Sequence, residues 1–362
     1  MMRTLPKLFN SPLPVTLTTK ILRLCVVVLL LVASSSCFDS CQPPFPPSNQ
    51  IDKFRILAIQ VDPPEVTPGD PVKVKFLSVN ESGLVKPSEF LDFTKCFVDG
   101  GPADPTAIWV GCLPGVGDDP QATNSCGQIP GFGPPASDGG TGGPSDGSFA
   151  DGGLGDQFQL FFPPCGGSST WSTPSDYLDP LPSDKQKQGA DALVVLATLF
   201  RGQQQVTLKK VRLSTKSKSQ QNTNPRLTGM KINGKEAEAC RPENANECNL
   251  VIVPAEKDVE VEAFLDPTRQ DSLPPTDGGV AQNEDITIEW FATQGSFTLR
   301  RTLRSGANPP EHSPWPKWQP YDFTGKALPQ GLEVQIIGIA RDKRGGVDWL
   351  SLRIILGPSE GK

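Results

Sequence analysis

The chain has 362 residues, a formal net charge of −6, and 35 glycines and 38 prolines. An acidic chain without a basic stripe is a poor nucleic-acid binder, because neutralised phosphates supply most of that affinity. The length allows two domains of ordinary size. Beyond residue 36 the sequence lacks sustained helical periodicity, and short alternating runs between Gly, Pro, Asn and Asp clusters favour antiparallel β structure.

Residues 1–36 have the layout of a secretory signal peptide. Lys20 and Arg23 precede an apolar run, Leu24 to Val32, and residues 33–36 (Ala-Ser-Ser-Ser) are the small residues expected at a cleavage site. The run is too short to span a bilayer, which takes roughly 20 apolar residues. The sequence therefore predicts export and removal of this segment.

Cys37 follows these small residues directly. This order resembles the lipobox of bacterial lipoproteins, with one departure, since Ser34 stands where leucine is usual. The resemblance implies diacylation of the Cys37 thiol, cleavage before Cys37 and acylation of the new amino terminus, which together give stable membrane anchoring. Phe38 in place of aspartate implies, by similarity to enterobacterial sorting, the outer membrane. The alternative is an ordinary signal peptide cleaved nearby, with Cys37 as a disulfide partner.

The next segment, residues 37–52, contains the proline-rich stretch Gln42–Gln50. Dense proline favours an extended chain, so this segment is expected to act as a tether between the lipid and the first domain. The first domain, residues 53–213, follows this tether and begins with alternating strands.

Six strands are predicted in residues 53–213. They are Arg55–Val61, Val72–Phe76, Ala107–Val110, Phe158–Phe162, Leu193–Phe200 and Val206–Leu213. A proline-rich turn over Asp62–Asp70 separates the first two, and Arg201–Gln205 is the loop of a closing hairpin.

A polar stretch without apolar periodicity, residues 214–225, is expected to link two domains. The second domain, 226–357, repeats the order of opening strand, alternating strand, tryptophan strand and final hairpin. Its strands are Arg226–Ile232, Val259–Phe264, Ile286–Phe291, Leu332–Ala340 and Val347–Leu356. We interpret the two halves as copies of one plan.

Short strands, a tryptophan on a central strand (Trp109 and Trp290) and a terminal hairpin resemble the immunoglobulin-like β-sandwich. The predicted fold class is all-β, with two tandem immunoglobulin-like sandwiches after a lipoprotein signal peptide. Three features carry a further resemblance: the Arg55–Val61 strand with its Pro-Pro-Glu-Val turn, the Asn-Thr-Asn-Pro junction, and the hairpin sequence Arg341–Trp349. With them the chain resembles tandem immunoglobulin-like lipoproteins of the myxobacterial type. The resemblance implies location and architecture and carries no ligand.

The cysteines beyond Cys37 predict disulfides in an oxidising compartment, because none forms a CxxC pair and the chain has one histidine, which argues against structural zinc. The spacing alone does not assign the pairs. Our expectation is Cys240 with Cys248, Cys96 with Cys112, and Cys126 with Cys165. Cys41 is left over, either free or paired with another chain.

The first domain contains a Gly/Asp-rich insertion near 113–157. It has almost no aliphatic residues, so it cannot bury enough surface to offset its ordering entropy, and a mobile excursion with cysteines at its base is expected. Four of its aspartates, at 138, 146, 151 and 156, suggest calcium ligands, but the spacing fits no calcium-loop pattern and a flexible linker is the alternative.

Gly143–Gly147 matches the GxSxG nucleophile motif by letters. That chemistry needs a strand, a helix and a histidine base, whereas here the flanks are glycine and proline and His312 lies in a loop. We therefore expect no catalytic residues, no metal site and no cofactor. The alternative is an accessory glycan- or peptide-active envelope enzyme with an unrecognised acid pair, for which Asp342 and Asp348 are the acids at hand.

A proline- and tryptophan-rich loop, residues 309–321, is the candidate binding loop. Trp315, Trp318 and Tyr321 are residue types favoured in contact surfaces, and prolines stiffen the chain that carries them. The alternative is that the loop folds back and its tryptophans anchor it to its own domain.

A basic cluster lies in residues 209–218, where it offers either a patch for an anionic partner or a solvated face.

The leading hypothesis is a non-enzymatic, membrane-anchored envelope lipoprotein that acts in surface binding, adhesion or scaffolding. Its partners would be the membrane, through the lipid, and an envelope protein or glycan. A purely mechanical spacer is a further alternative.

Overall fold

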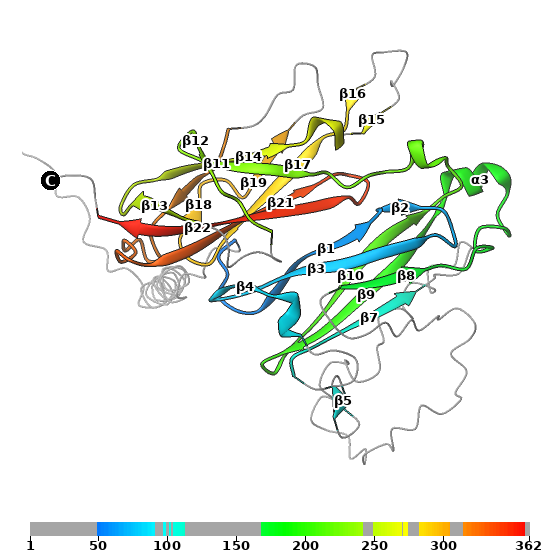
Figure 1. Cartoon of the computed structure of the whole chain (residues 1–362), viewed down its shortest axis with the longest axis horizontal. Helices are drawn as coiled ribbons and strands as arrows, with labels where there is room; N and C mark the ends of the chain where they lie inside the picture. The colour runs from blue at the N-terminus through cyan, green and yellow to red at the C-terminus, as the bar shows by residue number, and fades with distance from the viewer. Residues whose placement is uncertain are drawn as a thin grey trace, which may run out of the picture. The chain divides into compact units, whose positions relative to one another are not determined.

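The computed structural model describes residues 49–90, 97–98, 101–102, 104–112, 168–241, 249–269, 271–273, 282–304 and 314–358. In these residues almost all regular structure is β-strand, with one short α-helix and isolated 3-10 turns (Figure 1). The fold class is all-β, as the alternating sequence predicts. No helix in the described ranges is long and apolar enough to cross a bilayer.

The first half of the chain forms two sheets that share one core, here called the first sandwich. The strands of one sheet are β1 (Arg55–Asp62), β3 (Pro71–Asn80), β4 (Gly83–Val85) and β8 (Ser168–Ser172). The other sheet has the order β2 (Glu65–Val66), β10 (Gln203–Leu213), β9 (Ala190–Phe200) and β7 (Thr106–Cys112). The remaining elements are η1 (Pro87–Glu89), the hairpin of β5 (Phe97–Val98) and β6 (Gly101–Pro102), and α3 (Ser183–Gln188).

The second half forms a second sandwich after η3 (Lys218–Gln220). One sheet has the order β12 (Lys235–Ala237), β11 (Leu227–Ile232), β14 (Val259–Leu265), β20 (Lys317–Gln319) and β18 (Ser296–Phe297). The other has the order β13 (Leu250–Pro254), β22 (Val347–Gly357), β21 (Glu333–Arg341), β17 (Ile286–Ala292) and β19 (Arg301–Arg304). The remaining elements are η5 (Pro267–Arg269) and the pair β15 (Ser272–Leu273) and β16 (Gln282–Asn283).

The two sandwiches follow one topology, so the repeated order of strands is present in the structure. The order β1-β3-β8 corresponds to β11-β14-β20, and the order β2-β10-β9-β7 corresponds to β13-β22-β21-β17. In both copies the short strand at the edge, β2 or β13, is parallel to the last strand while the other pairs are antiparallel. Facing antiparallel sheets with a tryptophan on the β7 and β17 strands fit the immunoglobulin-like sandwich.

The predicted hairpin of the first sandwich is present, with a tighter turn than expected. Its strands β9 and β10 are connected by only Arg201 and Gly202, because β10 already begins at Gln203. Both turn residues have positive φ, 50° and 75°, the conformation that a two-residue hairpin turn between twisted strands requires.

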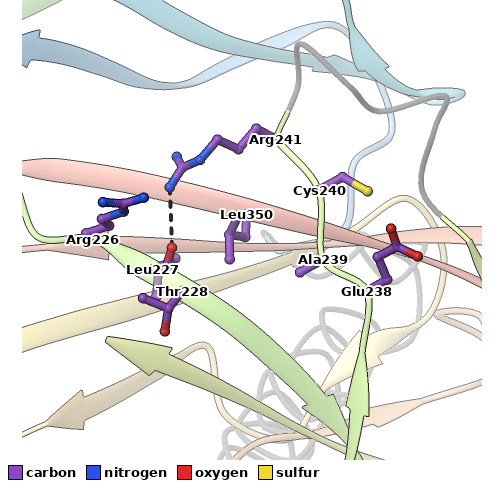
Figure 2. Close-up of a pocket in the computed structure, with 8 residues that line it drawn as sticks. All are labelled: Arg226, Leu227, Thr228, Glu238, Ala239, Cys240, Arg241 and Leu350. Carbon is purple, nitrogen blue, oxygen red and sulfur yellow. Dashed lines mark hydrogen bonds between the residues drawn. The ribbon is translucent and has the colours of Figure 1, made fainter. Parts of the chain in front are cut away.

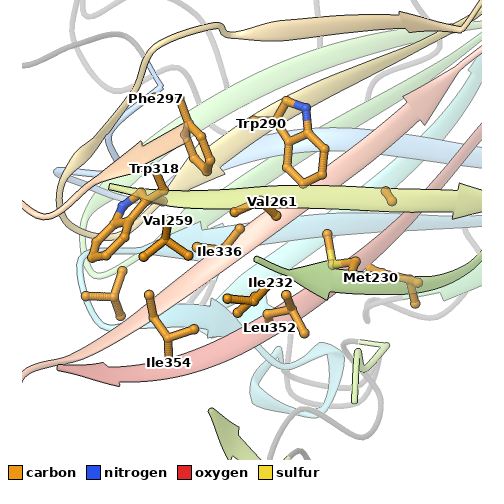
Figure 3. Packing of buried hydrophobic residues seen from close by; sticks show 14 of the residues in the cluster. Met230, Ile232, Val259, Val261, Trp290, Phe297, Trp318, Ile336, Leu352 and Ile354 are labelled. Carbon is orange, nitrogen blue, oxygen red and sulfur yellow. The ribbon is translucent and has the colours of Figure 1, made fainter. Parts of the chain in front are cut away.

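Each sandwich has its own apolar core, and the predicted tryptophans lie in them. Trp109 is 3% exposed and packs beside Phe76, with ring centroids 5.7 Å apart. Trp290 is fully buried, and its indole N–H donates to Thr302 Oγ1 at 3.0 Å. Figure 3 shows Trp290, Phe297 and Trp318 along one part of the second core, above the aliphatic side chains of the facing strands.

A third apolar cluster, here called the junction cluster, joins the two sandwiches. Residues on β1 and β3 pack against residues on β21 and β22, so the contact lies outside both sandwich cores. Its buried members are Ile51, Ala58, Leu77, Val79, Ile337, Ile339, Val347 and Trp349. Because this cluster binds the halves together, Pro47–Lys362 is one compact unit although no sheet contains strands from both halves.

Candidate functional site

The segment predicted as a linker, residues 214–225, is a hydrogen-bonded strap between the sandwiches. On the side of the first sandwich its partner is Glu65 of β2, which is 2% exposed. The Glu65 carboxylate accepts from Ser214 Oγ at 2.8 Å and from the Asn222 amide at 2.9 Å, and it lies 2.9 Å from Lys216 Nζ. Burial alone would raise the pKa of Glu65, but these hydrogen bonds outweigh it and hold that pKa below its usual range.

On the side of the second sandwich the strap is held by the turn between β21 and β22. Asn224 bridges the halves, since its Nδ2 donates to Val61 O at 2.8 Å and its Oδ1 accepts from Val347 N at 2.9 Å. Asn222 Nδ2 donates to Asp342 Oδ2 at 3.2 Å. Asp342 also accepts from two amides of its own turn, so one carboxylate shapes the turn and holds the strap.

Three carboxylates, Asp271, Glu284 and Asp342, gather around Arg344 beside this strap. Arg344 Nε donates to Glu284 Oε2 at 3.2 Å, and its Nη2 is paired with Asp271. Glu284 is 3% exposed. Burial, together with the charge of Asp342, raises the pKa of Glu284 to about 7 against the opposing effect of Arg344. The single positive charge of Arg344 thus lies beside three carboxylates, and it cannot neutralise all of them.

A further buried carboxylate, Asp348, lies on β22 of the second sandwich. Arg241 contacts it through both terminal nitrogens, at 2.7 and 3.1 Å, and Leu227 N donates to it at 2.8 Å. Arg241 also donates to Leu227 O at 3.3 Å, the dashed line of Figure 2. The pocket drawn there has a volume of about 370 Å³, with Arg226 and Arg241 toward one end and Glu238 toward the other.

Another pocket, of about 380 Å³, lies at the junction and is here called the junction pocket. Both sandwiches and the strap contribute to its lining. The basic side chains that line it are Lys210, Arg212, Lys216, Lys343 and Arg344, and the acidic ones are Glu65 and Asp191. A positively lined pocket in an acidic chain is the most distinctive charged feature among the described residues.

The basic cluster predicted in residues 209–218 contributes Lys210, Arg212 and Lys216 to the lining of this pocket. The other two basic residues of the lining, Lys343 and Arg344, lie more than a hundred residues further along the chain and were not predicted to lie beside them. The alternating pattern of β10 places Lys210 and Arg212 on one face of the strand, which is the only local signal that they act together.

The structure corrects the candidate binding loop at Trp318. This residue lies on β20 in the core of the second sandwich, is 0% exposed, and donates its indole N–H to Gln294 O at 2.9 Å. Trp315 is partly buried against the same core, and Tyr321 Oη donates to Glu256 O at 3.1 Å. Trp318 is therefore an anchor of its own domain, which is the alternative given for this loop.

The other predicted sites fall mainly outside the described residues. These include Cys37, Cys41, Cys96, Cys126, Cys165, Cys248, His312, the insertion near 113–157, the strand predicted at 158–162 and the signal peptide, and the side chain of Cys112 is outside them as well. Cys240 is disulfide-bonded, and its pairing with Cys248 stays a prediction. Within the described residues no group of three or more His, Cys, Asp or Glu side chains is arranged to hold a metal ion.

The acids of the accessory-enzyme alternative are both buried, Asp342 at 9% and Asp348 at 4% exposure. Asp342 is occupied by backbone amides of its turn and by Asn222, and Asp348 by Arg241. The two carboxylates that line the junction pocket, Glu65 and Asp191, are likewise each in an ion pair.

Comparison with known proteins adds no family. No family model matches the chain, and no curated protein matches it. Among solved structures, it is similar to dimeric latent PorU from Porphyromonas gingivalis at 9% identity and a TM-score of 0.22, covering 86% of this chain and 25% of that one. The native conformation of alpha-2-macroglobulin from E. coli is similar at 12% identity and a TM-score of 0.22, covering 88% of this chain and 18% of that one. The chain therefore spans a quarter or less of the length of these proteins.

Proposed function

We propose that this chain is a lipid-anchored lipoprotein of the bacterial cell envelope, on the outer membrane, whose two immunoglobulin-like sandwiches act as a non-enzymatic binding or scaffolding module. The observation that carries the proposal is the junction cluster. Apolar faces of β1–β3 and β21–β22 are buried against each other, with Leu77 and Ile339 almost fully excluded from water. Such burial favours a fixed spacing between the sandwiches over a flexible chain of modules.

The hydrogen bonds of the strap support the same role. Asn224 holds both halves by its side chain, and Asp342 holds the strap to the second half, so the strap restricts relative motion in addition to connecting the sandwiches. A rigid pair presents its loops and pockets at a fixed spacing from one another, which suits a scaffold or receptor that meets an envelope protein or glycan. Disulfides among the predicted cysteines are part of the proposal for an oxidising compartment.

The anchor is tested by acylation and fractionation of the full chain in its host or in a heterologous Gram-negative cell. Wild type is expected to incorporate an alkyne fatty acid and to sediment with outer membranes. Cys37→Ser is expected to lose the label and to leave the membrane fraction, because a single residue carries the acyl chains. Cys41→Ser is the matched control, since it removes a neighbouring thiol and leaves Cys37 in place. Equal labelling of wild type and Cys37→Ser would overturn the anchor.

The binding role is tested by crosslinking in intact cells, followed by mass spectrometry of proteins and glycans held by the chain. The expected result is a recurrent neighbour whose crosslinks map to one face of the paired sandwiches. Crosslinks scattered evenly over the surface, with no recurrent neighbour, would contradict a binding module and favour a mechanical spacer.

A further inference from the structure

The junction pocket brings cations from distant parts of the chain to one place. Lys210 and Arg212 come from β10, Lys216 from the strap, and Lys343 and Arg344 from the turn between β21 and β22. Since the junction cluster fixes the two sandwiches against each other, the spacing of these cations is built into the fold. The pocket exists only when both halves are assembled.

The ion pairs inside the pocket leave lysine donors for a ligand. Lys210 Nζ lies 3.2 Å from Asp191, Lys216 Nζ lies 2.9 Å from Glu65, and Lys343 Nζ lies 2.8 Å from Asp285. A lysine ammonium has three N–H donors, so each of these lysines can hold a further acceptor beside its carboxylate. The guanidinium groups of Arg212 and Arg344 are each engaged by two acceptors of the chain.

Lys209, the neighbour of Lys210 on β10, donates its Nζ to the carbonyl of Gly345 at the pocket wall. Burial, with the charge of Arg341 nearby, lowers the pKa of Lys209 to about 8, although Asp342 acts in the opposite direction. A lysine of the first sandwich therefore holds a wall of the pocket that belongs to the second sandwich.

We propose that the junction pocket binds a small phosphate ester, with the ammonium groups of Lys210, Lys216 and Lys343 around the phosphate. A phosphate monoester carries more negative charge than a carboxylate and has three acceptor oxygens, which matches a lining with more basic than acidic side chains and with three lysines that each keep N–H donors. The volume of about 380 Å³ suits a ligand of sugar-phosphate or glycerol-phosphate size. This inference rests on the proposed binding role and is independent of the lipid anchor.

The test is isothermal titration of the full chain in detergent at low salt with glucose 6-phosphate and with glycerol 3-phosphate. The first represents a glycan phosphate and the second a lipid-headgroup phosphate, so the tighter ester identifies the source. Binding of at least one ester is expected in the range of about 1 mM or tighter. The variant Lys210→Gln with Lys343→Gln removes one cation from each sandwich and is expected to weaken binding about tenfold or more.

The matched control is Lys218→Gln, because Lys218 belongs to the same basic stretch but lies outside the pocket and is paired with Asp70. It is expected to bind like wild type. If the double variant unfolds at a lower temperature than wild type, Lys343→Gln alone replaces it, because the Lys343 side chain is 76% exposed. The proposal is overturned if neither ester binds at about 10 mM, or if Lys218→Gln weakens binding as much as the double variant. Neither result bears on acylation of Cys37.

Discussion

Glu284 is a carboxylate whose surroundings favour its neutral form. Its pKa is raised to about 7 by burial and by Asp342, so the folded protein binds a proton there that the unfolded chain releases near pH 4.5. The stabilisation by this proton is complete below pH 4.5 and is lost as the pH rises to about 7. The free energy of unfolding should therefore fall over this window, by an amount on the order of 1–3 kcal/mol from this group.

Glu284→Gln should flatten that fall, because the amide stays neutral and its oxygen can still accept from Asp271 N, as Glu284 does at 3.3 Å. Urea unfolding at pH 5 and pH 8 measures the difference. Glu236→Gln, an exposed glutamate on β12, is the control and should keep the pH dependence of wild type. If the free energy of unfolding of Glu284→Gln falls between pH 5 and pH 8 as much as that of wild type, another group causes the pH dependence.

Trp318 is the second residue with a clear expectation. Trp318→Ala removes a fully buried indole and its hydrogen bond to Gln294 O, and the cavity should cost about 3–5 kcal/mol of unfolding free energy. Trp315→Ala should cost clearly less, because Trp315 is only partly buried. Chemical denaturation of both variants, followed by tryptophan fluorescence, tests the ranking, and equal losses would argue against the separate roles given to these two residues.

Among the elements, the strap gives the most specific prediction. Asn224→Ala removes three side-chain hydrogen bonds, to Val61 O and Asp62 Oδ1 in the first sandwich and from Val347 N in the second. The loss should be about 1–3 kcal/mol, because Val61 O and Val347 N are left without their partner. Hydrogen exchange at the Val347 amide should accelerate as well. Asn249→Ala, which removes an exposed asparagine paired with Glu238, is the control and should change neither quantity appreciably.

Sequence patterns predicted the long strands well and the short ones poorly. Period-two alternation over Val259–Phe264 follows directly from one buried face, and the structure has β14 there. β22 lies where the closing hairpin was predicted, but it is buried on both faces over its first six residues. The three-residue strand β20 was hidden, because prolines on both sides of Lys317–Gln319 predict a loop. Its pairing with β14 depends on residues far away in the sequence.

The strap shows why the candidate site was only half predictable. Its polar sequence is typical of a solvated linker, yet Asn222 is 1% exposed, with its backbone N–H donating to Glu65 and its Nδ2 donating to Asp342. Those partners lie about 157 and 120 residues away along the chain. Local composition does not predict such pairings. For the same reason it did not predict that Lys343 and Lys210 line one pocket, because only the strand topology places them together.

For the whole molecule, the junction cluster decides whether the sandwiches unfold together. Leu77 lies on the outer face of β3, is 1% exposed, and belongs to the junction cluster but to neither sandwich core. With the cluster intact we expect one cooperative thermal transition. Leu77→Asp buries an unpaired charge in the contact, so the halves should separate while their own cores stay packed, giving two transitions at lower temperature.

Differential scanning calorimetry measures this through the ratio of calorimetric to van't Hoff enthalpy, which should be near unity for wild type and should rise clearly in Leu77→Asp. Leu208→Asp is the matched control, because Leu208 is 54% exposed on β10 and lies outside the junction cluster, so it should keep a single transition. If Leu77→Asp also unfolds in one transition, the hydrogen bonds between the halves, such as those of Asn224 with Val61 and Val347 and of Arg341 with Leu57, suffice to couple the sandwiches. The fixed spacing on which the proposed scaffold depends would have to be sought in those hydrogen bonds.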